Sequence, residues 1–122
     1  MTAPLRMLVV DDDPDLRRSL HQQFTDEDFK VETAEDGEAA LQMLSACDYD
    51  IVLLDLKMPR MDGATLLGEM KKLRKHPRVV ILTIVDDLKR AIECTKLGAN
   101  DYVTKPYDPE ELLHVVIKVL SS

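Results

Sequence analysis

The chain has 122 residues, a length that fits one domain around a single core, and 16 Lys and Arg against 23 Asp and Glu give a net charge of −7. That charge argues against non-specific attraction to nucleic acid or to an anionic membrane. No apolar run approaches the roughly 20 residues of a membrane span, and MTAPLRMLVVDDD meets acids too early for a signal peptide. The composition predicts one soluble domain, residues 1–122, in the cytoplasm.

Short apolar runs alternate five times with amphipathic segments. The apolar runs predict strands near residues 6–10, 29–34, 50–54, 79–83 and 101–104. The amphipathic segments predict helices from Pro14 onward, over 36–46, 64–74 and 87–97, and from Pro109 onward. Asp13 and Asp108 are the expected N-caps of the first and last helices, and Gly98 is the expected end of the fourth.

This alternation is typical of an α/β fold with a parallel sheet that is covered by helices on both faces. Right-handed crossovers favour a doubly wound (βα)5 arrangement. A dinucleotide-binding sheet would need a Gly-rich turn after the first strand, where the sequence instead has Asp11-Asp12-Asp13-Pro14. We therefore expect a flavodoxin-like sandwich with the strand order 2-1-3-4-5.

Polar side chains follow four of the expected strands, at the edge where open α/β sheets bind ligands. They are Asp11, Asp12, Asp55, Thr83 and Lys105. Carboxylates at about 4 Å repel each other by about 4 kcal/mol per pair at an effective dielectric near 20, so this cluster needs a cation. A small number of oxygen ligands favours Mg²⁺ over Ca²⁺, which is typically held by a larger set of protein oxygens. Asp55 is placed to attack a phosphoryl group, which Lys105 and Thr83 would neutralise and hydrogen-bond.

Other chemistry-bearing residues are expected to be structural or solvated. They are His21, His76, His114, Cys47, Cys94 and the basic run Lys71, Lys72, Arg74 and Lys75. The histidines lack metal-ligand spacing. The two isolated cysteines are expected to be buried, and the basic run is expected on the exposed side of the third helix.

Four stretches together resemble the receiver domain of two-component response regulators. They are VVDDDP (9–14), DIVLLDLKMPRMDG (50–63), VVILT (79–83) and GANDYVTKPYD (98–108). The resemblance covers essentially the whole chain. It implies a phosphorylation-activated signalling switch in a two-component phosphorelay, and not a turnover enzyme.

The resemblance also implies a role for each matching residue. Asp11 and Asp12 would hold Mg²⁺ with Asp55 and the backbone carbonyl of Lys57. Asp55 would be the phosphoacceptor, Thr83 and Lys105 would contact the phosphoryl group, and the Lys105–Pro106 bond would be cis. Tyr102 would be the switch aromatic, with an ordinary packing role as the alternative.

Partners follow from the same resemblance. A sensor histidine kinase, a phosphotransfer protein or a small phosphodonor would supply the phosphoryl group. The fourth helix, fifth strand and fifth helix would form the output surface for a downstream effector, and dimerisation on phosphorylation stays open. The sequence leaves open whether the domain stands alone or belongs to a longer regulator.

Two departures from the family pattern involve three positions. Ile84 stands where the family usually has a small residue, so it is expected to crowd the approach to Asp55. Lys57 and Val85 occupy positions that tune hydrolysis, and neither is a typical water-activating residue. We therefore predict a phosphoryl lifetime longer than that of fast chemotaxis-type receivers.

Two alternatives are weighed against this interpretation. One is a receiver-like binding module that signals without phosphorylation, for which Ile84 is the only support. The other is a haloacid-dehalogenase-type phosphatase, with Asp11 as nucleophile and Asp13 as general acid. The chain has little room for the cap of that family, and this alternative leaves MPRMDG and VTKP unexplained.

Overall fold

The computed structural model describes residues 3–122, in which strands and helices alternate along the chain. The strands are β1 (Arg6–Val10), β2 (Lys30–Ala34), β3 (Ile51–Asp55), β4 (Arg78–Ile84) and β5 (Asp101–Lys105). The helices are α1 (Pro14–Thr25), α2 (Gly37–Ala46), α3 (Gly63–Met70), the 3-10 helix η1 (Val85–Asp87), α4 (Leu88–Lys96) and α5 (Pro109–Leu120). Among these residues, no helix is long and apolar enough to cross a bilayer.

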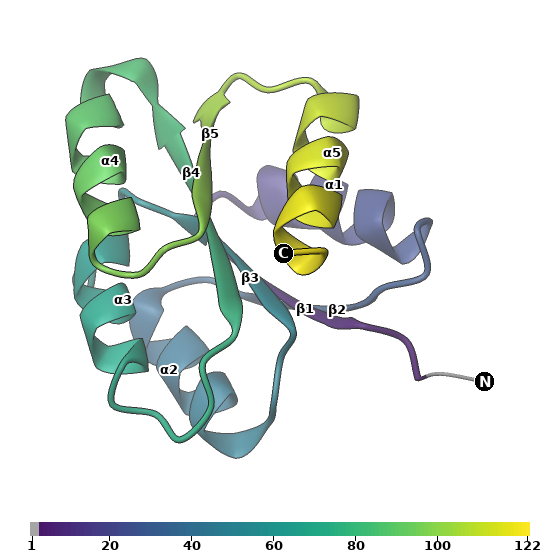
Figure 1. Cartoon of the computed structure of the whole chain (residues 1–122), viewed down its shortest axis with the longest axis horizontal. Coiled ribbons are helices and arrows are strands. Elements are labelled where there is room, and N and C mark those ends of the chain that lie inside the picture. The colour runs from purple at the N-terminus through teal and green to yellow at the C-terminus, as the bar shows by residue number, and fades with distance from the viewer. Residues whose placement is uncertain (1–2) are drawn as a thin grey trace.

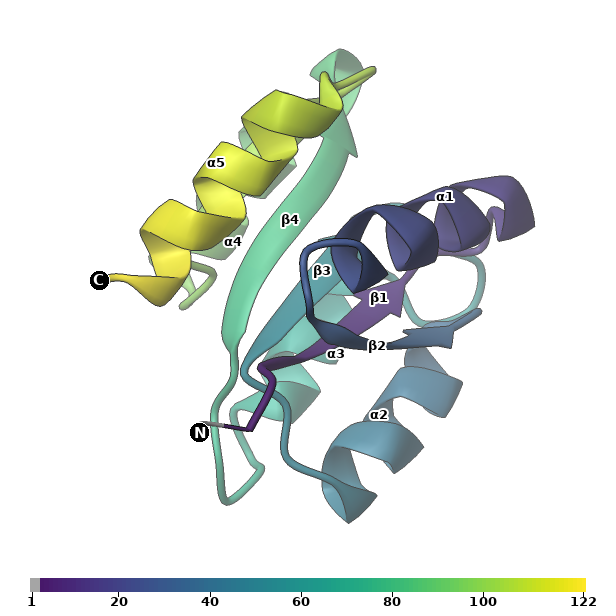
Figure 2. The same cartoon turned by 90° about the vertical axis from the view of Figure 1, so that its right-hand side faces the viewer.

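All strands pair in parallel in the order β2-β1-β3-β4-β5, which confirms the predicted topology. The sheet is the middle of three layers, with α1 and α5 on one face and α2, α3 and α4 on the other (Figures 1 and 2). Its register places Asp55 beside Leu82 and Thr83 beside Thr104. The carboxyl ends of β1, β3, β4 and β5 therefore lie at one edge of the sheet.

Alternate residues of each central strand enter two separate cores, because successive side chains point to opposite faces. Leu53 packs with Phe24 of α1 and Val116 of α5, whereas Leu54 packs with Leu66 of α3 and the helices on its side. Every residue of β3 is buried. This double burial explains why the strands are continuous apolar runs rather than alternating ones.

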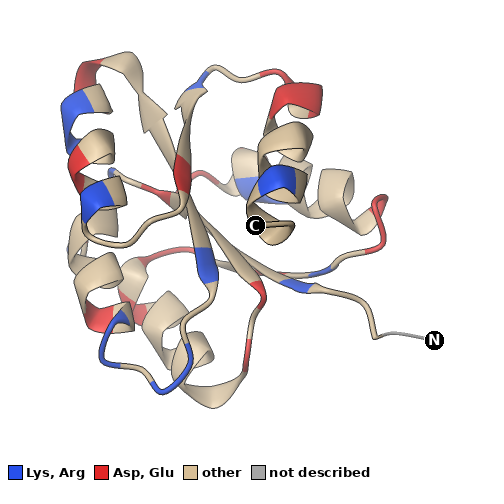
Figure 3. Cartoon of the chain, in the orientation of Figure 1, with Lys and Arg blue, Asp and Glu red and all other residues tan. Residues whose placement is uncertain are grey.

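The third helix is shorter than predicted, since α3 ends at Met70 and not near residue 74. Beyond Met70 the chain continues in tighter turns, in which Lys72 and Leu73 donate to the carbonyls three residues earlier. These turns let Leu73 pack against the core while the basic run faces solvent. The run therefore lies in an exposed loop after α3, visible at the lower left of Figure 3, and not on a helix face.

Candidate functional site

The acidic residues at the strand ends form one cluster. One carboxylate oxygen from each of Asp11, Asp12 and Asp55 lies within 4.8 Å of the others. The Lys105 ammonium lies 3.1 Å from Asp11 Oδ2 and 3.4 Å from Asp55 Oδ1. Asp11 and Asp55 are buried, and Asp12 is exposed. The topology thus brings together side chains from the ends of three strands.

Local hydrogen bonds orient the first acidic pair. Asp11 Oδ1 accepts a hydrogen bond from the Asp13 amide at 2.9 Å. The Asp13 carboxylate caps α1 by accepting from the Asp15 and Leu16 amides. Because Asp13 is engaged at the helix end and stands outside the carboxylate cluster, the phosphatase alternative loses its general acid.

The loop after Asp55 packs closely against that residue's own backbone. A Cβ at Gly63 would lie 2.7 Å from the Asp55 carbonyl oxygen, so only glycine fits there. The Gly63 amide donates to the Leu56 carbonyl, and the Lys57 amide reaches Asp55 Oδ1 at 3.4 Å. These contacts fix the return of the chain into α3.

Negative charge is in excess around Asp55. Burial and then the charge of Asp11 raise the Asp55 pKa to about 6, against the opposing effect of Lys105. Burial and the charge of Asp11 likewise raise the pKa of Tyr107 to about 12. Burial would lower the pKa of Lys105, but Asp11 and Asp55 outweigh it and raise that pKa.

This charge imbalance fits a divalent cation. Three carboxylates against one ammonium leave a net negative charge, and the donors are all oxygen atoms. Oxygen-rich sites with one or two buried carboxylates are typical of Mg²⁺ rather than of zinc or copper. The residues present therefore fit Mg²⁺.

A cavity of about 170 Å³ opens beside Asp55. Its walls are Asp55, Leu56, Lys57, Thr83, Ile84, Asp87 and Lys105. Thr83 is buried, and its hydroxyl donates to the Ile84 carbonyl at 3.2 Å. The Ile84 side chain is 40% exposed at this wall. The cavity thus joins the candidate nucleophile to a hydroxyl and an ammonium.

The other predicted site residues lie around this centre. Val85 is exposed in η1, and Tyr102 is half-buried on β5 against the core that contains α4. The Lys105–Pro106 bond is cis, the geometry that the resemblance implies. Within residues 3–122, the Tyr102 side chain makes no hydrogen bond to Thr83.

Sequence reasoning missed two residues near the cluster. Asp87 lines the cavity, and Arg17 donates to the Asp11 carbonyl at 2.6 Å. The signal for Asp87 is the acidic pair Asp86-Asp87, three and four residues after Thr83. Arg17 gave no such signal, because a cation in the first turns of a helix is usually solvated.

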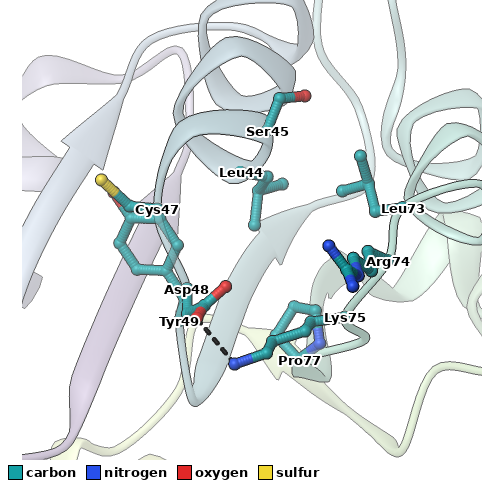
Figure 4. A pocket seen from close by; sticks show the side chains of 9 residues that line it. All are labelled: Leu44, Ser45, Cys47, Asp48, Tyr49, Leu73, Arg74, Lys75 and Pro77. Carbon is teal, nitrogen blue, oxygen red and sulfur yellow. Dashed lines mark hydrogen bonds and ion pairs between the residues drawn. The ribbon is translucent and has the colours of Figure 1, made fainter.

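A second cavity, of about 310 Å³, lies at the opposite edge of the sheet, before β3 and β4 (Figure 4). Its walls include Leu44 and Leu73, and Lys75 forms an ion pair with Asp48 at 2.8 Å. Cys47 is exposed here, so its predicted burial is wrong, whereas Cys94 is buried. Cys47 follows the last residue of α2, where the chain leaves the core for a loop. The histidines are exposed, as expected.

This chain is similar to known proteins. The response regulator receiver domain model matches residues 7–117. Regulatory protein AtoC of Escherichia coli is 38% identical over 98% of this chain and 26% of AtoC. Response regulator MprA of Mycolicibacterium vanbaalenii is 36% identical over 90% of this chain and 48% of MprA. The chain therefore spans between a quarter and a half of these relatives.

Solved structures of receiver proteins have a similar fold. Chemotaxis protein CheY4 of Vibrio cholerae superposes with a TM-score of 0.87 at 29% identity, covering 96% of this chain and 99% of that one. The receiver domain of NtrX from Brucella abortus gives 0.89 at 30% identity, covering 95% and 98%. By its strand order, its family match and these relatives, the chain belongs to the response regulator receiver domain family.

Proposed function

We propose that Asp55 is the phosphoacceptor of this receiver domain and that residues 1–122 form one such domain. The observation that carries the proposal is the surroundings of Asp55. Its buried carboxylate lies 3.4 Å from the Lys105 ammonium, within the acidic cluster, and at the wall of a cavity that it shares with Thr83. These are the groups that phosphoryl transfer to a carboxylate requires.

In the proposed step an Asp55 oxygen attacks the phosphorus of a phosphohistidine or an acyl phosphate. The bond between phosphorus and the donor atom breaks as the new phosphorus–oxygen bond forms, and the donor keeps the electron pair. Lys105 offsets charge on the phosphoryl oxygens. Thr83 turns from the Ile84 carbonyl to donate a hydrogen bond to one of them.

The residues proposed to hold Mg²⁺ are Asp11, Asp12, Asp55 and the backbone carbonyl of Lys57. When bound, the ion supplies positive charge that offsets both the carboxylates and the phosphoryl oxygens. Burial and then the negative charge of Asp11 raise the Asp55 pKa, and a bound cation would offset that charge, which supports this assignment.

Phosphorylation is proposed to shift populations at the surface formed by α4, β5 and α5. Thr83 lies beside Thr104 of β5, so movement of Thr83 toward the phosphoryl group would free space near Tyr102. The output surface also carries exposed apolar side chains that suit an effector. They are Ile92 on α4, Leu97 directly after α4 and Ile117 on α5.

The proposed location of the domain is the cytoplasm. Its proposed partners are a sensor histidine kinase or phosphotransfer protein and a downstream effector domain or protein. Dimerisation on phosphorylation is one form that the output can take. The net charge of −7 argues against direct nucleic-acid or membrane contact. The phosphoryl group stays on the protein until slow hydrolysis, so the domain is a signalling acceptor rather than a turnover enzyme. Hydrolysis of the phosphoprotein within seconds would contradict the lifetime predicted from Lys57 and Val85.

The test is the intact mass of the protein after incubation with acetyl phosphate, with and without Mg²⁺. We expect one added phosphoryl group in the wild type that requires Mg²⁺ and is lost in Asp55→Asn. Asp48→Asn, which changes an exposed acid at the opposite edge of the sheet, is the matched control and should gain the group. If neither the wild type nor Ile84→Ala gains a phosphoryl group, the result would favour the phosphorylation-independent binding module.

A further inference from the structure

Asp87 stands at a helix start but does not cap its helix. Each α-helix of the described chain follows an aspartate, and four of these aspartates accept a hydrogen bond from an amide of the first turn. They are Asp13, Asp36, Asp62 and Asp108. Asp87, at the N-cap of α4, makes no side-chain capping bond. Since aspartate is among the preferred N-cap residues, α4 departs in this respect from the other four α-helices of the described chain.

The Asp87 side chain contributes to the cavity beside the phosphoacceptor. It lines the 170 Å³ cavity together with Asp55, Thr83 and Lys105. Its Oδ2 atom is buried, and no donor among residues 3–122 hydrogen-bonds to it. A buried carboxylate oxygen without a hydrogen-bond donor is unfavourable, yet the fold places this carboxylate at the cavity wall.

Two of the nearby cations are already paired with other carboxylates. The Lys105 ammonium contacts Asp11 and Asp55, and the Arg90 guanidinium on α4 pairs with Asp62 at 2.8 Å. An incoming phosphoryl group is itself anionic, and like charges in a partly desolvated cavity repel strongly. Asp87 therefore opposes the charge that Asp55 has to accept.

We propose that the negative charge of Asp87, at the wall of the phosphoacceptor pocket, slows transfer of the phosphoryl group to Asp55. The inference rests on the proposed function of Asp55. In the step affected, the phosphorus–oxygen bond to acetate breaks, a phosphorus–oxygen bond to Asp55 forms, and acetate leaves with the electron pair. Asp87 forms no bond to phosphorus and acts only through the electrostatic repulsion of its charge.

The test compares Asp87→Asn with Asp86→Asn in the initial rate of phosphorylation by acetyl phosphate with Mg²⁺, followed by intact mass. Asn keeps the shape of Asp and caps helices equally well, so the change removes charge and little else. Asp86 is exposed on the same turn and does not line the cavity, which makes it a control of equal net charge. We expect Asp87→Asn to be faster by about threefold or more, Asp86→Asn to stay within about twofold of wild type, and Asp87→Glu to return to the wild-type rate.

The outcomes distinguish failure of the proposed function from failure of the inference about Asp87. If Asp55 gains no phosphoryl group in wild type or in any variant, the proposed function fails and the inference falls with it. If wild type is phosphorylated but Asp87→Asn is equally fast or slower, the inference alone is overturned. Mg²⁺ affinity measured by calorimetry should be similar in Asp87→Asn and wild type. A large loss of affinity would show that Asp87 acts through the cation, which would also overturn the proposal.

Discussion

The guanidinium of Arg90 on α4 lies 2.8 Å from Oδ2 of Asp62, the residue that caps α3. The other oxygen, Asp62 Oδ1, accepts from the Thr65 amide at 2.8 Å. The Thr65 amide first, and then Arg90, hold the Asp62 pKa below its usual range. Because Asp62 ends the loop that begins after Asp55, this carboxylate connects that loop to the start of the output surface.

We predict that Asp62→Ala destabilises the protein more than Arg90→Gln does. Loss of the cap costs about 1 kcal/mol, and the ion pair adds about 0.5 kcal/mol because Arg90 is 46% and Asp62 33% exposed. Urea unfolding of both single variants and of the double variant measures the two contributions. The double variant should be little less stable than Asp62→Ala alone.

Arg18→Gln is the control for this comparison. Arg18 pairs with Asp15 at 2.6 Å, but both side chains are largely exposed, so its loss should leave the unfolding free energy nearly unchanged. Strict additivity of Asp62→Ala and Arg90→Gln would show that the pair contributes nothing.

A second prediction concerns the charge of the acidic cluster. Without divalent cations, Asp55→Asn should be more stable than wild type by about 1–3 kcal/mol near neutral pH, because it removes a buried carboxylate beside Asp11. Mg²⁺ should stabilise wild type and have less effect on Asp55→Asn. Thermal unfolding with EDTA and with Mg²⁺ measures both effects. A metal-free Asp55→Asn that is less stable than wild type would mean that pairing with Lys105 outweighs the repulsion.

The strand order and the acidic cluster could be predicted because both follow from local patterns. Buried parallel strands are short apolar runs, and the residue that ends each run lies at the same edge of the sheet. The pattern therefore predicts that Asp55 and Lys105 share one pocket although they are far apart in the sequence.

Features that depend on the path of a loop could not be predicted in this way. Asp87 directly precedes α4, as the capping aspartates precede their helices, but it is also the last residue of the 3-10 helix η1, and its side chain lines the cavity instead of capping α4. Cys47 is exposed because α2 ends just before it, and helix ends are the least regular part of a periodic pattern.

A third prediction concerns the free energy of unfolding at acidic pH. Glu32 on β2 accepts hydrogen bonds from Arg6 and from the Tyr49 hydroxyl, each at 2.9 Å, and these partners, Arg6 first, hold its pKa below the usual 4.5. A carboxyl whose folded pKa is lowered contributes stability that is complete above the unfolded pKa and is lost as pH falls through the folded one. Wild type should therefore lose more unfolding free energy than Glu32→Gln as pH falls below about 5.

Urea unfolding over this pH range measures the difference. Glu27→Gln, which changes an exposed carboxyl in the turn after α1, is the control and should follow wild type. Parallel curves for Glu32→Gln and wild type would show that the contacts with Arg6 and Tyr49 do not favour the ionised form.

The last prediction concerns access to Asp55. Ile84 lies at the cavity wall beside Asp55, where its side chain narrows the path for a phosphodonor. We expect Ile84→Ala to be phosphorylated by acetyl phosphate about three to ten times faster than wild type, since a wider opening lowers the barrier to a productive approach. Ile92→Ala is the matched control, because Ile92 is also 40% exposed and does not line the cavity. Initial rates from intact mass should rise for Ile84→Ala alone. Equal rates for both variants and wild type would mean that Ile84 does not limit entry, and that the charge at the cavity wall, rather than its width, governs how Asp55 receives a small donor.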